Sequence, residues 1–383
     1  MTANGTTGNL ARVYRRVMAA HSALPYSLDP SGRALPAWHY FFEVTRRCNL
    51  RCRMCQYRDW FERHPAGEAA EEELTLDEWK GLVDQTSRLS LISFTGGEPW
   101  VRGDFDAILA YAAMKRRVHV ITNGTLLDEE RLKRCIEFAP RKMTGKGLMF
   151  LGASIDGTAA MHDAIRGREG AFETTLGALR RLAALRHDAG KRCPMIHVTA
   201  VIQNDNLDAL PQLPAILAQA GVDVLNLTME IRFLHLENIG AVDPDQFCGA
   251  PLELPCIDSG RLSKTLNAVH DAAARAGIEI RLPDMPEGEL LRYHSGGLDL
   301  TQFRCRGPWT NCYVGANGDV YPCFIKRIGN VRETSLATLW NGPAFRDFRK
   351  RVRNGLFCVC QGCCHLEYAG PRYADQPSRT SSR

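Results

Sequence analysis

Short apolar runs alternate with longer amphipathic stretches between residues 38 and 229, and this alternation restricts the fold more than any other feature. Six of the apolar runs have the length and composition of β-strands, and the stretches between them have helical periodicity. Strands that alternate with helices pair in parallel, because each helix returns the chain to the starting end of the sheet. The sequence therefore predicts an α/β fold, either a partial barrel or an open doubly wound sheet.

Polar residues and glycines follow the predicted strands at their carboxyl ends. The predicted strands cover residues 38–44, 91–94, 118–122, 148–155, 196–202 and 222–229, and the predicted helices cover 76–88, 105–114, 128–138, 171–189 and 207–220. Thr75 and Glu78 form a capping box at the first of these helices. Ligands of parallel α/β folds bind at the carboxyl edge of the sheet, so we expect the chemistry of this protein there.

Three cysteines, Cys48, Cys52 and Cys55, follow the first predicted strand. At this spacing three thiolates can bind three irons of a 4Fe-4S cluster and leave the fourth iron without a protein ligand. The alternative is a zinc knuckle, but structural zinc sites take four ligands and favour Cys-x-x-Cys pairs or histidine partners. His64 is the nearest candidate for a fourth ligand, and the gap between Cys48 and Cys52 is unlike that of a zinc finger. The spacing therefore favours an iron-sulfur cluster with one open iron.

A turn of sequence Thr-Gly-Gly-Glu-Pro, residues 95–99, ends the second predicted strand. Its two glycines allow the backbone to approach a ligand closely. The cysteine spacing and this turn together resemble the radical S-adenosylmethionine (radical SAM) enzymes. The resemblance implies a partial (β/α)6 TIM barrel, in which SAM chelates the open iron and is cleaved reductively to a 5'-deoxyadenosyl radical.

A second stretch, residues 154–172, resembles the radical SAM subgroup that carries a C-terminal SPASM or Twitch domain. By this resemblance Arg166 pairs with the carboxylate of SAM through the two-pronged geometry of its guanidinium group. Asn123 and Asn204 are further candidates to face SAM, and turn chemistry after a strand is the alternative role for Asp156. The SAM contacts that the resemblance implies are Gly96, Gly97, Glu98, Ser154, Asp156 and Arg166.

Seven of the 14 cysteines lie in the last fifth of the chain, which indicates a second metal site. The Asn317-Gly318 pair between two apolar runs predicts a hairpin that brings Cys305 and Cys323 together, and a helix over 336–353 returns the chain to the last cysteines. Resemblance to the Twitch half of a SPASM domain implies a small C-terminal α+β domain with one fully ligated 4Fe-4S cluster, since no cysteine follows Cys364. The implied ligands are Cys305, Cys323, Cys360 and Cys363; the alternative ligands are Cys312, Cys358 and Cys364, and the alternative metal is zinc.

The formal net charge of +5 is modest and the Lys and Arg residues are scattered, so we expect no nucleic-acid partner. No apolar run approaches the ~20 residues that span a membrane, and no signal peptide is recognisable. We therefore expect a cytoplasmic protein without disulfides, in which Cys135 and Cys193 are small buried thiols. The expected parts are an N-terminal extension (1–37), the radical SAM barrel (38–245), a connecting segment with a helix at 261–276 (246–300), the auxiliary-cluster domain (301–370) and a tail (371–383).

An auxiliary cluster ligated only by thiolates has no open iron, so it is better suited to accept an electron than to bind a substrate. This favours net oxidation of the substrate, with Glu230 at the end of the last strand as base and a flavodoxin or ferredoxin-type protein as reductant. Only 47 residues precede Cys48, which leaves little room for a fused peptide-recognition domain and favours a small-molecule natural-product intermediate as substrate. The alternatives are a peptide-modifying enzyme, a redox-neutral epimerase with Cys248, Cys256 or Cys312 as hydrogen donor, and a non-catalytic iron-sulfur carrier or sensor.

Overall fold

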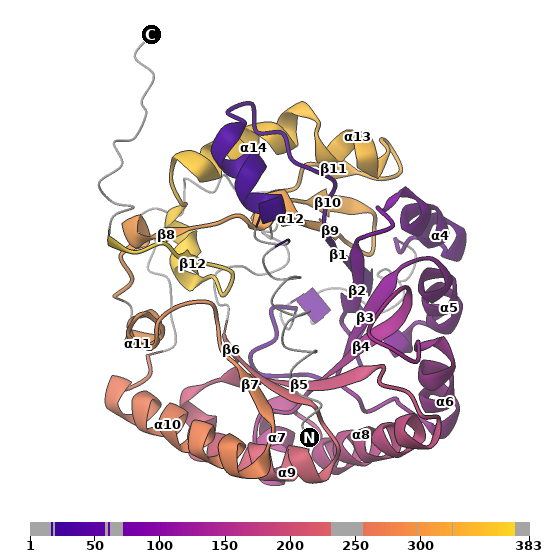
Figure 1. Ribbon diagram of the computed structural model, residues 1–383, viewed down its shortest axis with the longest axis vertical. Coiled ribbons are helices and arrows are strands. Elements are labelled where there is room, and N and C mark those ends of the chain that lie inside the picture. The colour runs from indigo at the N-terminus through magenta and orange to yellow at the C-terminus, as the bar shows by residue number, and fades with distance from the viewer. Residues whose placement is uncertain are drawn as a thin grey trace, which may run out of the picture.

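A computed structural model describes residues 17, 20–57, 60–61, 72–230, 256–295, 297–323 and 325–371. Within these residues one sheet of ten strands has the order β11-β10-β9-β1-β2-β3-β4-β5-β6-β7. A small second sheet pairs β12 (Glu367–Tyr368) with β8 (Phe303–Arg304). Figure 1 shows the large sheet curving around the centre of the molecule, with helices on its outer side. None of the described helices has the length and apolar character needed to cross a membrane.

Six strands of this sheet are parallel neighbours in chain order. They are β1 (His39–Thr45), β2 (Leu91–Gly96), β3 (Arg117–Thr122), β4 (Gly147–Ser154), β5 (Met195–Ile202) and β6 (Val224–Met229). The crossover helices are α4 (Leu76–Gln85), α5 (Phe105–Lys115), α6 (Glu129–Phe138), α8 (Ala171–Asp188) and α9 (Leu213–Gln219). The predicted α/β fold, a partial (β/α)6 barrel, is therefore confirmed, and each predicted strand matches its observed counterpart to within two residues.

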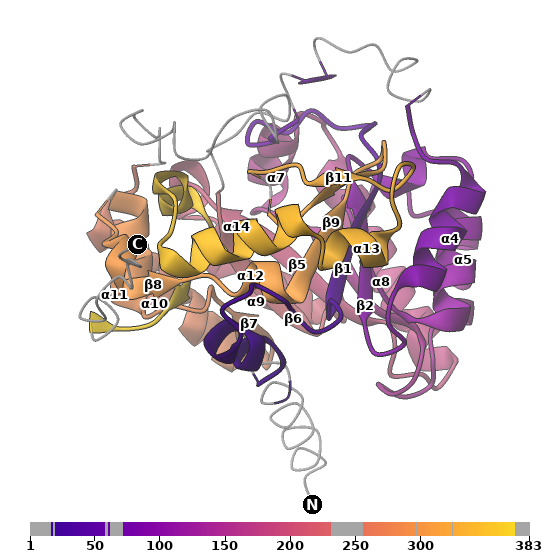
Figure 2. The same cartoon turned by 90° about the horizontal axis from the view of Figure 1, so that it is seen from above.

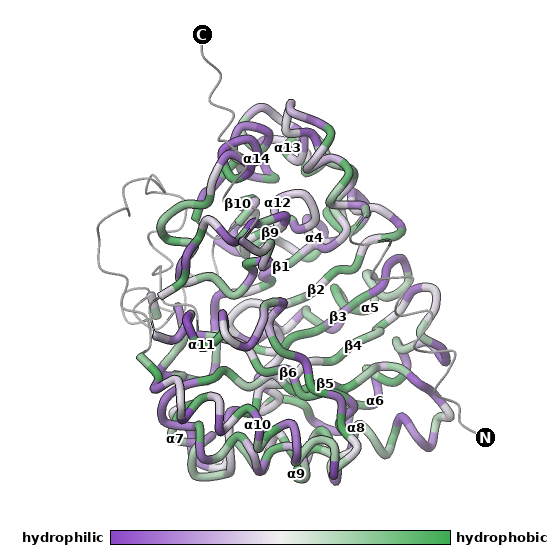
Figure 3. The backbone as a smooth tube through the Cα atoms, turned by 60° about the vertical axis from the view of Figure 1, so that its left-hand side comes forward, coloured by the Kyte–Doolittle hydropathy of each residue, from purple (hydrophilic) through white to green (hydrophobic). Residues whose placement is uncertain are grey.

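One face of the strands is buried under the helices, and the other face is partly exposed at several positions, although Ser93 and His197 on it are buried. In β1 the outward residues Tyr40, Phe42 and Val44 are buried under the helices, whereas His39 and Phe41 on the opposite face are partly exposed. We call the face turned away from the helices the inner face. Figure 3 shows hydrophobic residues concentrated along the strands, while the outer helices carry both hydrophobic and hydrophilic residues. The main core therefore lies between sheet and helices, and the inner face is left for other contacts.

Local sequence signals account for most helix boundaries. Thr75 caps α4, and the capping box with Glu78 is present.

Two helices that the sequence predicts as continuous are each divided in the structure, so these two predictions are wrong. The helix predicted over 207–220 is interrupted, with a 3-10 turn at Leu210–Gln212 before α9, because prolines stand at positions 211 and 214. The helix predicted over 336–353 is divided into α13 (Leu336–Trp340) and α14 (Pro343–Asn354), because Pro343 cannot continue a helix but starts one readily.

The described part of the connecting segment extends the barrel. Its predicted helix is present as α10 (Ser259–Ala276), and the short strand β7 (Glu279–Arg281) pairs in parallel with β6. Helix α11 (Glu287–Ser295) follows and contacts α10. Residues 246–300 thus supply one more crossover unit beyond the six that the sequence indicates. Most of the N-terminal helix predicted at residues 10–20, and the residue Cys248, lie outside the described residues.

The C-terminal part is joined to the same sheet through the predicted hairpin. Strands β9 (Asn311–Val314) and β10 (Asp319–Tyr321) are antiparallel around the turn at Asn317 and Gly318, and β11 (Gly329–Asn330) pairs with β10. On its other side β9 pairs in parallel with β1, with Phe41 opposite Tyr313. In Figures 1 and 2 α13 and α14 cover this end of the sheet. The hairpin therefore occupies the edge of β1 that a separate barrel would leave unpaired.

Candidate active site

The three barrel cysteines lie in the loop that directly follows β1. The backbone N–H groups of Leu50 and Tyr57 point at the sulfurs of Cys48 and Cys55, at 3.4 Å each. Burial, with a smaller contribution from neighbouring cysteines, raises the pKa of both of these thiols to about 11. Three neighbouring thiolates therefore need positive charge between them. A 4Fe-4S cluster supplies that charge and takes thiolate ligands, so this loop fits the cluster.

The glycine turn is packed against this cysteine loop. The N–H of Gly97 donates to the Thr45 carbonyl at 2.8 Å, and the N–H of Glu98 donates to the Arg47 carbonyl at 2.9 Å. A Cβ atom on Gly96 would lie 2.2 Å from the Thr45 carbonyl oxygen, and one on Gly97 would lie 2.2 Å from that of Arg47. The two glycines thus allow the end of β2 to approach the backbone that carries the cluster cysteines.

The Glu98 side chain is fully buried and joins strand ends. Its carboxylate accepts hydrogen bonds from the backbone N–H groups of Trp100 (3.2 Å) and Asn123 (2.7 Å) and from the hydroxyl of Thr122 (2.9 Å). Burial raises the pKa of Glu98 to about 7. Any contact of this residue with SAM is therefore made by its backbone and not by its carboxylate.

Arg166 and Asp156 form a buried ion pair beside the cysteine loop. The Nε of Arg166 donates to Asp156 at 2.6 Å, and its Nη1 lies 3.6 Å from the sulfur of Cys52. The second oxygen of Asp156 accepts from the N–H of Val201 at 3.0 Å. Arg166 ends helix α7 (Ala159–Arg166), an element that the sequence did not indicate. Asp156 therefore orients the guanidinium group, and Arg166 is the member of the pair that reaches the cluster loop.

A closed trio of polar side chains also holds the loop. Asn123 donates to the side chain of Asn49 at 2.9 Å, Asn49 donates to the hydroxyl of Thr125 at 2.9 Å, and that hydroxyl donates back to Asn123 at 2.7 Å. Sequence reasoning singled out Asn123 but missed Asn49 and Thr125, although both stand next to singled-out motifs. Asn204 is exposed, and the buried neighbour Asn206 donates to the carbonyl of Asp156 at 2.8 Å instead.

Ser154 and Glu230 stand at the carboxyl ends of two strands. Ser154 is the last residue of β4 and is partly exposed. Glu230 follows β6 directly and is 4% exposed, and the hydroxyl of Tyr293 donates to its backbone carbonyl at 2.9 Å. The predicted SAM contacts and Glu230 thus all come from the carboxyl edge of the sheet, the edge that carries the cysteine loop.

The four cysteines predicted as auxiliary ligands come together from three segments. Burial raises the pKa of Cys305 well above its usual value, and Cys323 and Cys360 raise it further. Burial raises the pKa of Cys363, and the neighbouring Cys364 and then Cys323, Cys360 and Cys305 raise it further. Among the described residues no group of three or more His, Cys, Asp or Glu side chains is arranged to hold a single metal ion. Four mutually interacting cysteines from three segments could hold a 4Fe-4S cluster, which takes four thiolate ligands.

The remaining cysteines near this group have other surroundings. Cys312 is fully buried on the outward side of β9, and Cys364 forms a hydrogen bond with Thr228 of β6. Cys358 is disulfide-bonded, so the expectation that disulfides are absent is wrong, because composition does not tell which thiols a fold brings into contact. The expected burial of Cys135 and Cys193 is confirmed.

Comparison with known families gives an independent view of this arrangement. Residues 42–213 match the profile described as the radical SAM superfamily, and residues 305–364 match SPASM, an iron-sulfur cluster-binding domain. The chain belongs to the radical SAM superfamily. It is a SPASM-containing radical SAM enzyme, and its cofactors are SAM, the 4Fe-4S cluster that binds SAM, and auxiliary iron-sulfur.

Several individual proteins are similar to this radical SAM enzyme over most of its length. An AdoMet-dependent heme synthase of Nitratidesulfovibrio vulgaris is 29% identical over 90% of this chain and 91% of its own. A PqqA peptide cyclase of Xanthomonas euvesicatoria is 26% identical over 86% of this chain and 81% of its own. The crystal structure of Streptococcus suis SuiB bound to S-adenosylmethionine superposes with a TM-score of 0.60 at 15% identity, over 91% of this chain and 74% of that one. The last likeness concerns the fold alone.

Proposed function

We propose that this radical SAM enzyme oxidises a small-molecule tetrapyrrole, a precursor or close relative of heme. The similarity to a heme synthase over 90% of this chain and 91% of that one supports this substrate class. The observation that carries the proposal is the composition of the inner face. It presents a row of imidazoles beside a flat aromatic pair, a combination that suits a large planar ligand with polar edges.

The imidazole row crosses five neighbouring strands. The Nε2 of His39 and the Nδ1 of His119 each lie 2.7 Å from the hydroxyl of Ser93, and the Nε2 of His119 lies 3.2 Å from that of His197. The last contact crosses β4 at Gly152, where a Cβ atom would lie 2.4 Å from the His197 ring nitrogen. Only glycine leaves room for this contact, so the row is a built feature of the fold.

The row is uncharged at neutral pH. Burial lowers the pKa of His39 to about 3 and that of His197 to about 4, and it lowers the pKa of His119 well below its usual value. Neutral imidazoles both donate and accept hydrogen bonds. Ser93 and both ring nitrogens of His119 are used inside the row, which leaves the Nδ1 atoms of His39 and His197 to bind a carbonyl, carboxyl or pyrrole edge. His39 is the partly exposed one of these two residues.

The aromatic pair lies at the junction of the barrel and the SPASM hairpin. The rings of Phe41 on β1 and Tyr313 on β9 are stacked, with centroids 4.7 Å apart and planes inclined by 11°. Both residues are partly exposed on the inner face. Flat aromatic surfaces bind conjugated macrocycles by offset or edge contacts. The pair therefore supports a planar substrate close to the auxiliary cysteines.

When bound, the reduced SAM cluster supplies a 5'-deoxyadenosyl radical that takes a hydrogen atom from the substrate, and the auxiliary cluster offers a site for the electron that oxidation releases. Glu230 is our candidate for the base that takes the accompanying proton, because it is a buried carboxylate at the carboxyl edge. Ser154 and Arg166, with the backbone of Gly96, Gly97 and Glu98, are the proposed SAM contacts. A flavodoxin or ferredoxin-type protein of the cytoplasm is the proposed reductant.

Binding and turnover of iron coproporphyrin III test this proposal. Anaerobically reconstituted enzyme is expected to shift the Soret band of the porphyrin on binding. With SAM and dithionite it is expected to release 5'-deoxyadenosine together with a tetrapyrrole of lower hydrogen content, detected by mass spectrometry. A chain that neither shifts the band of this porphyrin or its metal-free form, nor changes their mass, does not have this function.

The second candidate is modification of a peptide, which the similarity to a PqqA peptide cyclase supports. A peptide substrate would be delivered from a separate chain and would be recognised along its backbone. Pull-down of a short precursor peptide from the producing organism, followed by a mass change on incubation with SAM, would favour this candidate.

A redox-neutral epimerisation would give a different product. Deuterium from the solvent at an inverted stereocentre, with no net loss of hydrogen, would favour that reaction.

A further inference from the structure

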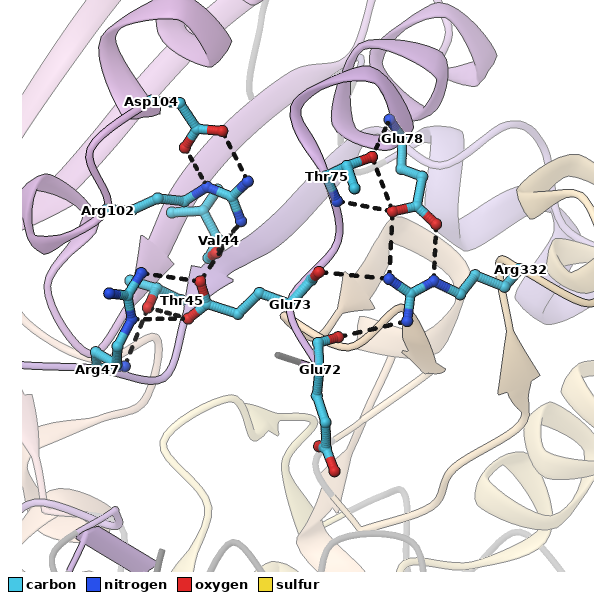
Figure 4. Close-up of polar contacts among 10 residues, drawn as sticks. All are labelled: Val44, Thr45, Arg47, Glu72, Glu73, Thr75, Glu78, Arg102, Asp104 and Arg332. Atoms are coloured by element: carbon cyan, nitrogen blue, oxygen red, sulfur yellow. Dashed lines mark hydrogen bonds and ion pairs between the residues drawn. The ribbon is translucent and has the colours of Figure 1, made fainter. Parts of the chain in front are cut away.

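Glu73 is a buried carboxylate that contacts the residues at the start of the cysteine loop. Its side chain is 6% exposed and lies in the segment that leads into α4. Figure 4 shows its carboxylate directed toward Thr45, Arg47 and Arg102. The Thr45 hydroxyl donates to Glu73, the Arg47 guanidinium donates to it at 3.0 and 3.3 Å, and Arg102 lies 3.7 Å away.

The partners of Glu73 are the residues that position the cluster loop. The carbonyls of Thr45 and Arg47 accept the N–H groups of Gly97 and Glu98, and Cys48 is the next residue in the chain. The same short stretch of backbone is therefore fixed twice. The glycine turn holds its carbonyls, and Glu73 holds its side chains.

The segment that contains Glu73 is fixed to the SPASM domain as well. The N–H of Leu74 donates to the carbonyl of Ala316, in the turn of the β9–β10 hairpin, at 2.7 Å. Arg332 donates to the carboxylate of Glu78 at 2.7 and 3.2 Å and to the carbonyl of Glu73 at 3.4 Å. Glu73 thus lies between the loop that binds the SAM cluster and the hairpin next to the auxiliary cysteines.

The network pairs two basic side chains with two acidic ones. Two arginines, Arg47 and Arg102, face two carboxylates, Glu73 and Asp104, and the contacts between Arg102 and Asp104 are 2.5 and 2.9 Å. The side chains of Arg102 and Glu73 are 7% and 6% exposed. Removing one member of a buried charge network leaves the others without compensation, so the remaining groups must move toward water.

We infer that Glu73 is a positioning residue that keeps the cysteine loop in its SAM-binding geometry and joins that loop to the SPASM domain. It touches none of the cysteines and acts on them through Thr45 and Arg47. The inference rests on the family activity and not on the tetrapyrrole proposal, because its readouts need SAM but no substrate.

Glu73→Gln in the full-length, reconstituted enzyme tests this inference, with Glu72→Gln as the matched control. Glu72 is the adjacent carboxylate, and Figure 4 shows its side chain exposed and directed away from the network. The measurements are iron per chain, the affinity for SAM, and the change in the EPR spectrum of the dithionite-reduced enzyme when SAM is added. Glu73→Gln is expected to bind SAM about tenfold more weakly, the factor typical of a hydrogen bond to a charged group, and to show an altered SAM-induced spectrum.

Two milder variants cover the case in which Glu73→Gln does not fold. Thr45→Val removes the hydroxyl that donates to Glu73 and that also accepts from the N–H of Arg47 at 3.1 Å. Arg332→Gln removes the contacts of a 43% exposed guanidinium to the Glu78 carboxylate and to the carbonyls of Glu72 and Glu73. Each is expected to weaken SAM binding by about threefold or more, since each loses at least one ordinary hydrogen bond. Unchanged affinity and spectrum in Glu73→Gln, or in Thr45→Val where Glu73→Gln does not fold, would overturn the positioning role. Unchanged values in Arg332→Gln would overturn the link to the SPASM domain.

Discussion

Three carboxylates in this site hold neighbouring segments of the chain in place. Glu98 joins the ends of β2 and β3, Asp156 orients Arg166, and Glu73 holds Thr45 and Arg47. All three side chains have low exposure, so their hydrogen bonds form in an environment that strengthens them. A cysteine loop that must release and rebind SAM is thereby supported by neighbours that stay fixed.

The raised pKa of Glu98 predicts a pH dependence of stability. Its pKa is about 7 in the folded chain, against an ordinary value of 4.5, because burial disfavours the charged form. A carboxyl group with a raised pKa contributes stability that is fully present below pH 4.5 and is lost as the pH rises through about 7. Glu98→Gln does not titrate, so it is expected to gain about 3 kcal/mol relative to wild type between pH 4.5 and pH 8. Anaerobic urea unfolding of both proteins measures this, and equal pH slopes would contradict it.

The close approach at Gly97 predicts a large effect of one methyl group. Gly97→Ala places a Cβ atom against the Arg47 carbonyl, so the cysteine loop must move. Release of 5'-deoxyadenosine is expected to fall by about 100-fold, the usual effect of a misplacement near 1 Å in an active site. Gly81→Ala is the control, because nothing lies within 4 Å of its added methyl in α4. It is expected to stabilise the protein by about 0.5–1 kcal/mol and to leave cleavage unchanged.

At the level of elements, the hairpin β9–β10 and the short helices around it gather the auxiliary cysteines from distant parts of the sequence. Cys305 precedes α12 (Gly307–Thr310), Cys323 follows β10, and Cys360 lies in the 3-10 turn η7 (Cys358–Gly362). Strands β8 (Phe303–Arg304) and β12 (Glu367–Tyr368) pair across the ends of this region. This pairing brings the first and the last of the cysteine-bearing segments together.

Removing one auxiliary ligand is expected to separate SAM cleavage from product formation. Wild-type enzyme is expected to hold about eight irons and Cys305→Ala about four, because a 4Fe-4S cluster held by four thiolates does not survive the loss of one. The variant should still release 5'-deoxyadenosine but form no oxidised product. Iron analysis and product detection measure both effects. Cys135→Ala, which removes a buried thiol in α6, is the control and should keep about eight irons. If this variant also lost about four irons, the lower iron content of Cys305→Ala would reflect misfolding and not the loss of a ligand.

Features with a local cause could be predicted from the sequence. The strand and helix alternation followed from periodicity, the start of α4 from Thr75 and Glu78, and the hairpin from Asn317-Gly318. The pairing of β9 with β1 could not be predicted, because partners more than 250 residues apart leave no local mark. Strand β7 has only three residues, too few for a periodic pattern. Glu73 belongs to no recognised motif, and its role follows only from what surrounds it.

On the scale of the whole molecule, the barrel and the SPASM domain share one sheet. β9 covers the edge of β1, and α13 contacts α4 on the outer side. Trp309 and Phe345 from the C-terminal part are fully buried in the same hydrophobic core cluster as Phe42 and Phe94 of the barrel. The two parts therefore stabilise one another and form a single cooperative unit.

Deletion of residues 301–383 is expected to unfold the barrel. The truncated chain would expose the edge of β1 and the apolar residues that the C-terminal part covers. We expect aggregated protein without iron, measured by size-exclusion chromatography and iron analysis. A soluble monomer that binds four irons and cleaves SAM would show that the barrel is independent of the SPASM domain.

The main-chain hydrogen bonds between β1 and β9 also affect the rate of electron transfer between the two iron-sulfur sites. β1 leads directly to Cys48, and β9 and β10 lead to Cys323, so no flexible linker separates the two iron-sulfur sites. Both iron-sulfur sites are attached to one sheet, so the distance between them does not depend on a domain opening or closing. Internal electron transfer should follow a single exponential whose rate is insensitive to solvent viscosity, as freeze-quench spectroscopy in glycerol can measure.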